Sequence, residues 1–410
     1  MPRLPRFLRR FGALLRADPS GFTVGLVALV VSTVTGLVAG LVLGSITDTL
    51  EQLPGLLVMV PALVGMRGNV FGALGSRLGT SIHTGTFQVS RRRDTVFGQN
   101  LIAAMSLSVS LSLLLAFLAK GMSVAFGVAH TISIGDFVVI AVIGGIVPSI
   151  VVMVITIGVA ALSVRRSWDL DNVSATLVTA SGDAITLPVL FLATYLVGLR
   201  IVTPVLAAIS IVGGLAMLVA SFRSRLPLVR RIVQESVPVL LLAGTLDTLA
   251  GLVFEKQLSS FFVYPVMLVL VPPFLSVSGS LGAILSARVS TKLHLGLVDP
   301  NRISLRPVAD DTLLVGTYAV PVFALLALGA AGVGHLAGLS SPGLLDLLGV
   351  VGLAAVGAFA FTVLLAYFTA ILSYRLGLDP DNHTIPIVTA SLDLLGAFAL
   401  ILAIVMLGLT

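Results

Sequence analysis

The sequence has no cysteine and little charge. The absence of cysteine among its 410 residues excludes disulfides and thiolate metal sites. Only 10% of the residues are charged, whereas 57% are hydrophobic. P-loop, His-Glu-x-x-His and Gly-x-Ser-x-Gly motifs are also missing, so an enzyme is the least favoured class. No polar segment is long enough for a separate soluble domain, and the composition therefore predicts an all-α polytopic membrane protein.

Long apolar runs predict about eleven membrane-spanning helices, on the criterion of ~20 residues per span. Their expected centres are Val31, Gly65 to Gly79, Leu111, Val151, Thr186, Ile211, Leu246, Leu275, Val322, Ala358 and Leu395. The helices are apolar all round, so hydrophobic periodicity adds little to this assignment.

The net charge of +6 comes from short loops, which indicates a lipid bilayer rather than nucleic acid as the partner. With the N-terminus inside, the predicted cytoplasmic loops carry Arg91, Arg92, Arg93, Arg165, Arg166, Arg223, Arg225, Arg230, Arg231, Arg302, Arg306 and Arg375. The predicted outer loops carry Lys120, Arg200 and Lys256. This asymmetry predicts a multi-pass protein of the cell membrane with a cytoplasmic N-terminus and an outside C-terminus.

An internal repeat relates the two halves of the chain. Residues 60–85 align with residues 271–296, and the matched pairs include Pro61 with Pro272, Gly68 with Gly279, Thr80 with Thr291, and His83 with His294. Ala39-Gly40-Leu41-Val42 aligns with Ala250-Gly251-Leu252-Val253 in the same register. Each half therefore contains five predicted spans, with one additional span near residues 200–222.

The repeat predicts four segments. They are a basic amphipathic segment at 1–20, a first five-helix repeat at 21–199, a linker helix and basic loop at 200–231, and a second five-helix repeat at 232–410. The additional span gives the two repeats a common direction, so they are parallel about an axis along the membrane normal. This is a two-fold dimer fused into one chain. We therefore expect a functional monomer with a pathway on the pseudo-two-fold axis.

Each half also carries one aspartate inside a late span, Asp183 and Asp393, preceded by Thr179 and Thr389. A carboxylate within a membrane span costs roughly 2.5–3.5 kcal/mol on insertion scales, which indicates a functional site. Two carboxylates close together repel unless a cation or proton lies between them, and hard divalent cations bind to oxygen ligands. The alternative is that each aspartate is protonated or hydrogen-bonded to a neighbouring helix.

Helix-breaking residues recur in the second span of each half, at Pro61, Gly65 and Gly68 and at Pro272 and Gly279. Interrupted spans at corresponding positions predict a transport site with a hinge, because unwound backbone can coordinate ions. A simple packing kink is the other interpretation. Beside the first break, Asn69 offers an amide oxygen as a further candidate ligand.

Several other polar residues have weaker claims to function. Asp169 and Asp379 begin helices at the predicted cytoplasmic mouth, where N-capping or an acidic vestibule would explain them. Asp247 lies within a span opposite Gly36 in the repeat, and is a candidate secondary cation or proton site. We expect Arg67 to snorkel or to pair with a carboxylate. The paired His83 and His294 favour a structural hydrogen-bonding role.

The motifs Val-Pro-Ala-Leu-Val-Gly-Met-Arg-Gly-Asn from Val60 and Val-Thr-Ala-Ser-Leu-Asp-Leu-Leu-Gly from Val388 resemble signatures of the solute carrier 41/MgtE superfamily of magnesium transporters. The resemblance covers both halves. It implies a magnesium-selective pathway along the axis, with Asp183 and Asp393 binding a partly hydrated ion. Asp169 and Asp379 would lie near the cytoplasmic entrance. The fused layout is similar to the solute carrier 41 branch, so gating by the cytoplasmic CBS domains of bacterial MgtE is not expected.

The sequence thus predicts a transporter of divalent cations, Mg²⁺ first, with no cofactor other than the transported ion. A Na⁺- or H⁺-coupled exchanger of Mg²⁺ or another divalent metal remains an alternative within transport. A non-transporting membrane scaffold or sensor is the alternative of another class, which the paired intramembrane carboxylates disfavour.

Overall fold

The protein is all-α in a computed structural model that describes residues 19–83, 92–166, 170–301, 304–377 and 380–409. Ten helices in this part are long and apolar enough to cross a membrane, and an eleventh has a shorter apolar portion. The predicted eleven spans are therefore confirmed. They are α2 (Pro19–Ser45), α4 (Leu56–His83), α5 (Val96–Ala125), α6 (Ile134–Arg166), α7 (Leu170–Thr194), α8 (Val202–Phe222), α9 (Pro227–Lys256), α11 (Val266–His294), α12 (Ala309–Leu336), α13 (Leu344–Arg375) and α14 (Pro380–Met406).

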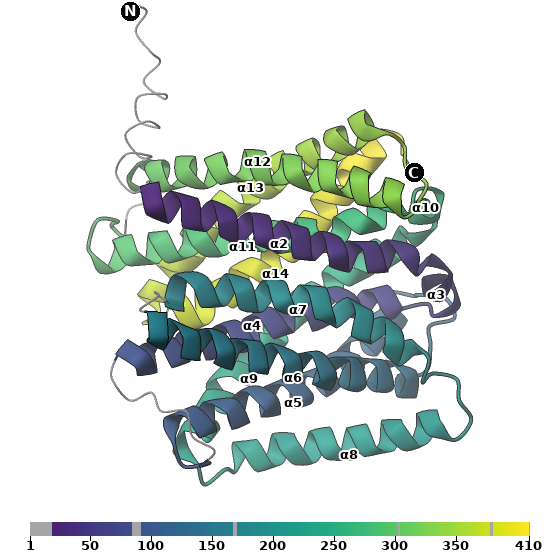
Figure 1. The fold of residues 1–410 in the computed structure, drawn as a ribbon, viewed down its shortest axis with the longest axis horizontal. Helices are drawn as coiled ribbons and strands as arrows, with labels where there is room; N and C mark the ends of the chain where they lie inside the picture. The colour runs from purple at the N-terminus through teal and green to yellow at the C-terminus, as the bar shows by residue number, and fades with distance from the viewer. Residues whose placement is uncertain (1–18, 84–91, 167–169, 302–303, 378–379, 410) are drawn as a thin grey trace, which may run out of the picture.

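Two short helices were not predicted, α3 (Thr47–Gln52) and α10 (Leu258–Val263). Each follows the first long helix of its repeat, and both lie at the same end of the bundle (Figure 1). Six residues give too little apolar length to be detected as a span, so only the repeat could have indicated them. A single turn of 3₁₀ helix, Arg306–Val308, precedes α12.

The first helix of each repeat packs on the other repeat. Helix α2 lies against α11 and α12 of the second repeat as well as α7 of its own, and α9 lies against α4 and α5 of the first repeat as well as α14 (Figure 1). The arrangement is the same in both directions, which agrees with two parallel repeats. Helix α8 packs against α5, α6 and α9 at the edge of the bundle. The segment boundaries at 199 and 231 stay a prediction.

Glycines allow this exchanged packing. A Cβ atom on Gly40 of α2 would lie 2.1 Å from the carbonyl oxygen of Val269, and one on Gly251 of α9 would lie 2.3 Å from that of Val58. Pro273 has no N–H to donate to the carbonyl of Val269, so that oxygen lacks its helical partner. A glycine brings the neighbouring backbone against such a carbonyl, where Cα–H···O contacts can form.

Helices α4 and α11 are continuous through their prolines, with Pro61 inside α4 and Pro272 inside α11. The expected unwinding of these spans is therefore wrong. A proline removes one backbone donor and bends a helix, but close packing on both sides holds the remaining turns together. Hinge roles for Gly65, Gly68 and Gly279 stay a prediction.

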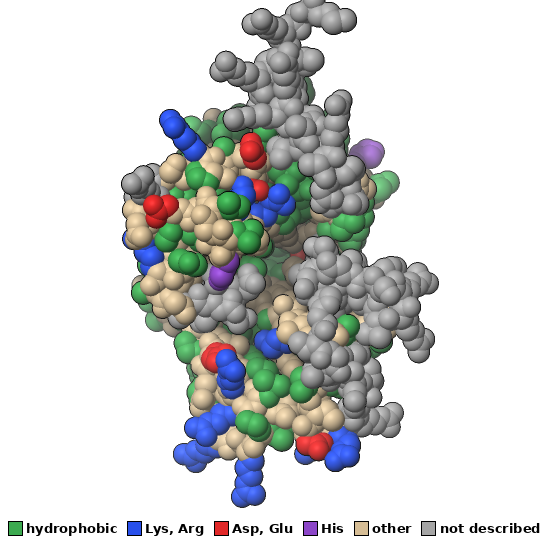
Figure 2. Space-filling view, turned by 90° about the vertical axis from the view of Figure 1, so that its left-hand side faces the viewer, with side chains coloured by type: hydrophobic (Ala, Val, Ile, Leu, Met, Phe, Trp, Pro, Cys, Tyr) green, Lys and Arg blue, Asp and Glu red, His purple; other side chains and the backbone are tan. Residues whose placement is uncertain are grey.

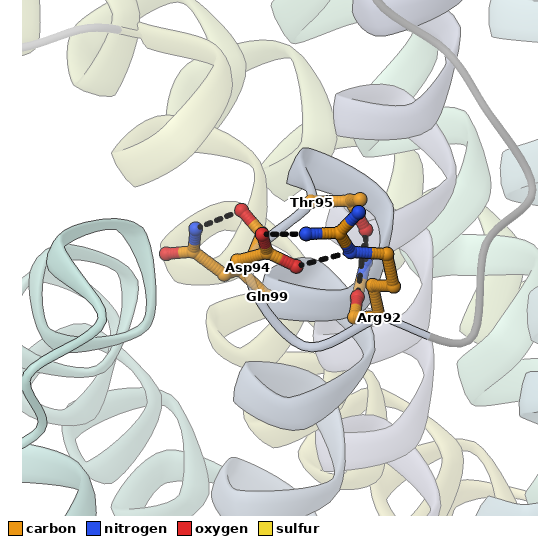
Figure 3. A network of polar contacts seen from close by, with 5 residues as sticks. Arg92, Asp94, Thr95 and Gln99 are labelled. Carbon is orange, nitrogen blue, oxygen red and sulfur yellow. Dashed lines mark hydrogen bonds and ion pairs between the residues drawn. The ribbon is translucent and has the colours of Figure 1, made fainter.

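Polar contacts fix the helix ends on the face where α5 and α9 begin. Thr95 caps α5 by accepting a hydrogen bond from the Gly98 N–H at 3.0 Å, and Arg92 pairs with Asp94 at 3.1 Å (Figure 3). The Gln99 side chain donates to the Asp94 carbonyl and accepts from the Leu228 N–H at 3.0 Å. These bonds join the start of α5 to the first turn of α9.

Equivalent residues of the two repeats join α4 to α5 and α11 to α12. Arg77 of α4 donates to Asn100 of α5 at 2.8 Å, and Arg288 of α11 pairs with Asp311 of α12 at 2.8 Å. Lys292 adds a second ion pair to Asp311. Basic side chains are visible over this face, including its lower part where α8 ends and α9 begins (Figure 2). A surface cavity there is lined by Arg223, Ser224, Arg225, Pro227, Arg230, Arg231, Gln234 and Glu235.

Candidate functional site

Asp183 and Asp393 lie near the middle of α7 and α14. The Asp183 side chain is 3% exposed, and its Oδ2 accepts a hydrogen bond of 2.7 Å from the Ser276 hydroxyl. Ser276 belongs to α11, so Asp183 reaches across to the second repeat. The Ser276 hydroxyl in turn lies 3.0 Å from that of Ser32 on α2. Asp183 is thus held by neutral hydroxyl groups.

Asp393 has a different environment. A Cβ atom on Gly65 of α4 would lie 3.7 Å from Asp393 Oδ2 and 2.8 Å from Asp247 Oδ2, so both carboxylates converge on the Gly65 backbone. Asp247 and Asp393 are hydrogen-bonding neighbours. Asp247 is 1% exposed and its Oδ1 has no hydrogen-bond partner, whereas Asp393 is half-buried.

All three carboxylates lie where the repeats meet, Asp183 against Ser276 of α11 and both Asp247 and Asp393 against Gly65 of α4. We call the region where α7 meets α11 and α14 meets α4 the central seam, since contacts there join the two repeats. Close carboxylates in an apolar interior require a cation or a proton between them. No group of three or more His, Asp or Glu in the described part of the chain stands close enough to hold a metal ion directly.

Two other predicted ligands, Thr179 and Thr389, lie one turn before Asp183 and Asp393 on α7 and α14. Thr179 packs on Gly68, where an added Cβ would lie 3.3 Å from the threonine Cγ2, and Thr389 packs on Gly279, where an added Cβ would lie 3.6 Å from the threonine Cβ. The Thr389 hydroxyl donates to the Pro386 carbonyl at 3.1 Å. Asn69 is half-buried on α4. Glycine–threonine packing is therefore equivalent in both repeats.

Arg67 is fully buried and pairs with no carboxylate among the described residues, so the prediction that it snorkels or pairs with an acid is wrong. The side chain is 0% exposed and donates to the carbonyls of Leu63 and Gly144, each at 2.7 Å, and to the Thr186 hydroxyl at 3.0 Å. The Gly144 carbonyl needs this donor because Pro148, four residues on in α6, has no N–H. Arg67 thereby joins α4 to α6 and α7. The second repeat has no proline in α13 and Ser278 at the equivalent position.

The side chains of Asp169, Asp379 and His83 lie outside the described residues or carry no described contact, so their predicted roles stay predictions. His294 places Nδ1 3.0 Å from the Ser290 carbonyl and its ring edge-on to Tyr374, which is a structural environment. Sequence reasoning did not identify Ser276 or Ser32 as site residues. The repeat offered a signal for Ser276, because it aligns with Gly65 in the register that pairs Gly68 with Gly279.

The fold is that of a polytopic membrane protein built from two repeats, with buried acidic side chains where the repeats meet. The MgtE family model, described as a divalent cation transporter, matches residues 60–193 and 271–403. The chain belongs to this family of divalent cation transporters, and it is not an enzyme.

Curated relatives extend this likeness over most of the chain. Solute carrier family 41 member 3 of Mus musculus is 27% identical over 86% of this chain and 75% of its own. The Rattus norvegicus member 3 is 28% identical over 85% and 78%, and the Homo sapiens member 2 is 24% identical over 87% and 65%. A eukaryotic MATE transporter, AtDTX14, aligns over 98% of this chain and 96% of its own with 14% identity, but its TM-score of 0.27 carries no argument.

Proposed function

We propose that the chain transports Mg²⁺ across the membrane along the central seam, with Asp183 and Asp393 binding a partly hydrated ion. The observation that carries the proposal is that buried acidic side chains lie where the repeats meet: Asp183 bonds to Ser276 of the second repeat, and Asp393 lies beside Gly65 of the first. Mg²⁺ dehydrates reluctantly and is usually bound through one or two carboxylates while keeping several waters. A site in the central seam that offers only a few protein ligands is therefore suited to Mg²⁺.

The site chemistry supports transport over a purely structural role for the aspartates. Neither carboxylate has a basic partner among its described contacts, although each lies in the middle of an apolar helix. A structural acid in a membrane is expected to pair with a base or a set of donors. The hydroxyls of Thr179 and Thr389 add oxygen atoms along the same seam. Backbone flexibility at Gly65, Gly68 and Gly279 would let the seam open.

We further propose that the monomer is the functional unit, since it already contains both repeats. The orientation follows from loop charge: the face with Arg223, Arg225 and Arg230 is cytoplasmic, and the C-terminus lies outside. This orientation places the mouth predicted for Asp169 and Asp379 at the cytoplasmic surface. Cysteine labelling is straightforward in a chain without native cysteine, and labelling of residue 225 from the outside would contradict the assignment.

The test is Mg²⁺ flux into proteoliposomes that contain a Mg²⁺-sensitive dye. Asp183→Asn and Asp393→Asn preserve side-chain shape while removing charge, and we expect each to lower the rate by at least about tenfold, because even an outer-shell partner of a metal contributes about 10–100-fold. Asp310→Asn, an exposed acid in the first turn of α12, is the matched control and should retain wild-type flux. Unchanged flux in both seam variants would refute the proposal. Competition by Mn²⁺, Co²⁺ and Ca²⁺ measures selectivity in the same assay.

A further inference from the structure

The two repeats differ in the residues that lie next to Asp183 and Asp393. In the register of the repeat, Ser276 beside Asp183 corresponds to Gly65 beside Asp393. Asp247 beside Asp393 corresponds to Gly36 in the first repeat. Asp183 therefore has a hydroxyl donor at 2.7 Å. Asp393 has a glycine in place of that donor and a second carboxylate, Asp247, as its neighbour.

The second carboxylate is unusually poor in partners. Asp247 is 1% exposed, lies within a membrane-spanning helix, and leaves Oδ1 without a hydrogen bond. Among the described residues, Asp393 of α14 and the Gly65 backbone of α4 lie beside it, and neither is basic. Two carboxylates side by side in an apolar interior repel each other unless a cation or a proton lies between them. The one described hydrogen-bonding neighbour of Asp247 is Asp393, which is itself an acid.

We propose that Asp247 and Asp393 are the direct ligands of the divalent cation, so that the ion binds off the pseudo-two-fold axis, on the second repeat beside Gly65. Asp183, already bonded to Ser276, then contacts the ion through water. This inference rests on the proposed function and assigns unequal roles to the three aspartates. Two carboxylates with the remaining positions filled by water match the coordination that Mg²⁺ prefers.

Accessibility supports this order. Asp393 is half-buried and Gly65 is also partly accessible, whereas Asp247 is enclosed. An ion entering the seam would meet Asp393 first and reach Asp247 beyond it. The lack of a side chain at residue 65 lets the Asp247 carboxylate lie directly against α4, because a Cβ there would lie 2.8 Å from Asp247 Oδ2.

The direct test is anomalous scattering from Mn²⁺ bound to crystals of the wild-type protein, which needs no variant that must fold. We expect a peak in contact with the carboxylate oxygens of Asp247 and Asp393 and separated from Asp183 by a water. A peak bridging Asp183 and Asp393 without Asp247 would overturn the inference. So would the absence of a peak at Asp247, the result expected if the two acids share only a proton.

Binding measurements separate this inference from the proposed function. Mg²⁺ titration of the full chain in detergent should show an affinity loss of about 10–100-fold for Asp183→Asn, the range for outer-shell partners of a metal, and a larger loss for the direct ligand in Asp247→Asn. Equal or greater loss in Asp183→Asn would overturn the off-axis site and leave the transporter intact. Unchanged Mg²⁺ affinity in all three single variants, Asp183→Asn, Asp247→Asn and Asp393→Asn, would contradict both the off-axis site and the proposed function.

Discussion

Arg67 and Pro148 should be energetically coupled although they lie on different helices. Pro148 leaves the Gly144 carbonyl without a helical donor, and Arg67 supplies one at 2.7 Å. In a background with Pro148, Arg67→Met leaves that buried carbonyl unpaired, which costs about 1–3 kcal/mol. In a background with Pro148→Ala, the restored N–H satisfies the carbonyl, so the same substitution should cost less by about that amount.

The coupling energy isolates the cost of the unpaired Gly144 carbonyl. The effect of Arg67→Met alone does not, because this substitution also removes a charge that was costly to bury. The free energy of unfolding is measured in mixed micelles for the wild type, Arg67→Met, Pro148→Ala and the double variant. We expect a coupling of about 1–3 kcal/mol, the cost of the unpaired carbonyl. Pro238 of α9 provides a matched control, since Arg67→Met and Pro238→Ala share no partner and should be additive. A coupling below about 0.5 kcal/mol with Pro148 would refute the reasoning.

Two further predictions concern packing and driving force. Gly251→Ala would place a Cβ 2.3 Å from the Val58 carbonyl oxygen, so it should lower the unfolding free energy by about 1–3 kcal/mol or more, whereas Gly213→Ala meets nothing within 4 Å and serves as its control. Equal stability of the two variants in thermal unfolding would disprove exchanged packing at this contact. An inside-negative potential of about 100 mV should favour Mg²⁺ entry by about 4.6 kcal/mol, at ~2.3 kcal/mol per charge, if the pathway is passive. A Mg²⁺ flux that does not change when potassium and valinomycin set the membrane potential would instead indicate electroneutral exchange.

The spans, the repeat and the two aspartates inside late spans could be identified from sequence because each leaves a local signal. Apolar length identifies a span, and Gly40 and Gly251 recur with Pro61 and Pro272 in one register. Asp183 and Asp393 are conspicuous because charge is expensive inside a membrane. The family match then confirmed the class of protein.

The contacts that distinguish the two repeats could not be predicted in this way. Arg67 bonds a carbonyl on α6 that Pro148 frees, and this partner lies 77 positions away in sequence. The proximity of Asp247 to Asp393 depends on α9 packing against α14, a contact that apolar periodicity does not encode. Proline content also predicted breaks in α4 and α11 that neighbouring helices prevent.

The most direct measurement is Mg²⁺ flux through the Asp183→Asn/Asp393→Asn double variant, purified as a monodisperse protein and reconstituted beside the wild type. If the cation crosses between the repeats by binding these carboxylates, flux should fall to the level of empty liposomes while Asp310→Asn remains active. Wild-type flux in the double variant would contradict the account, because the ion would then cross without either charge.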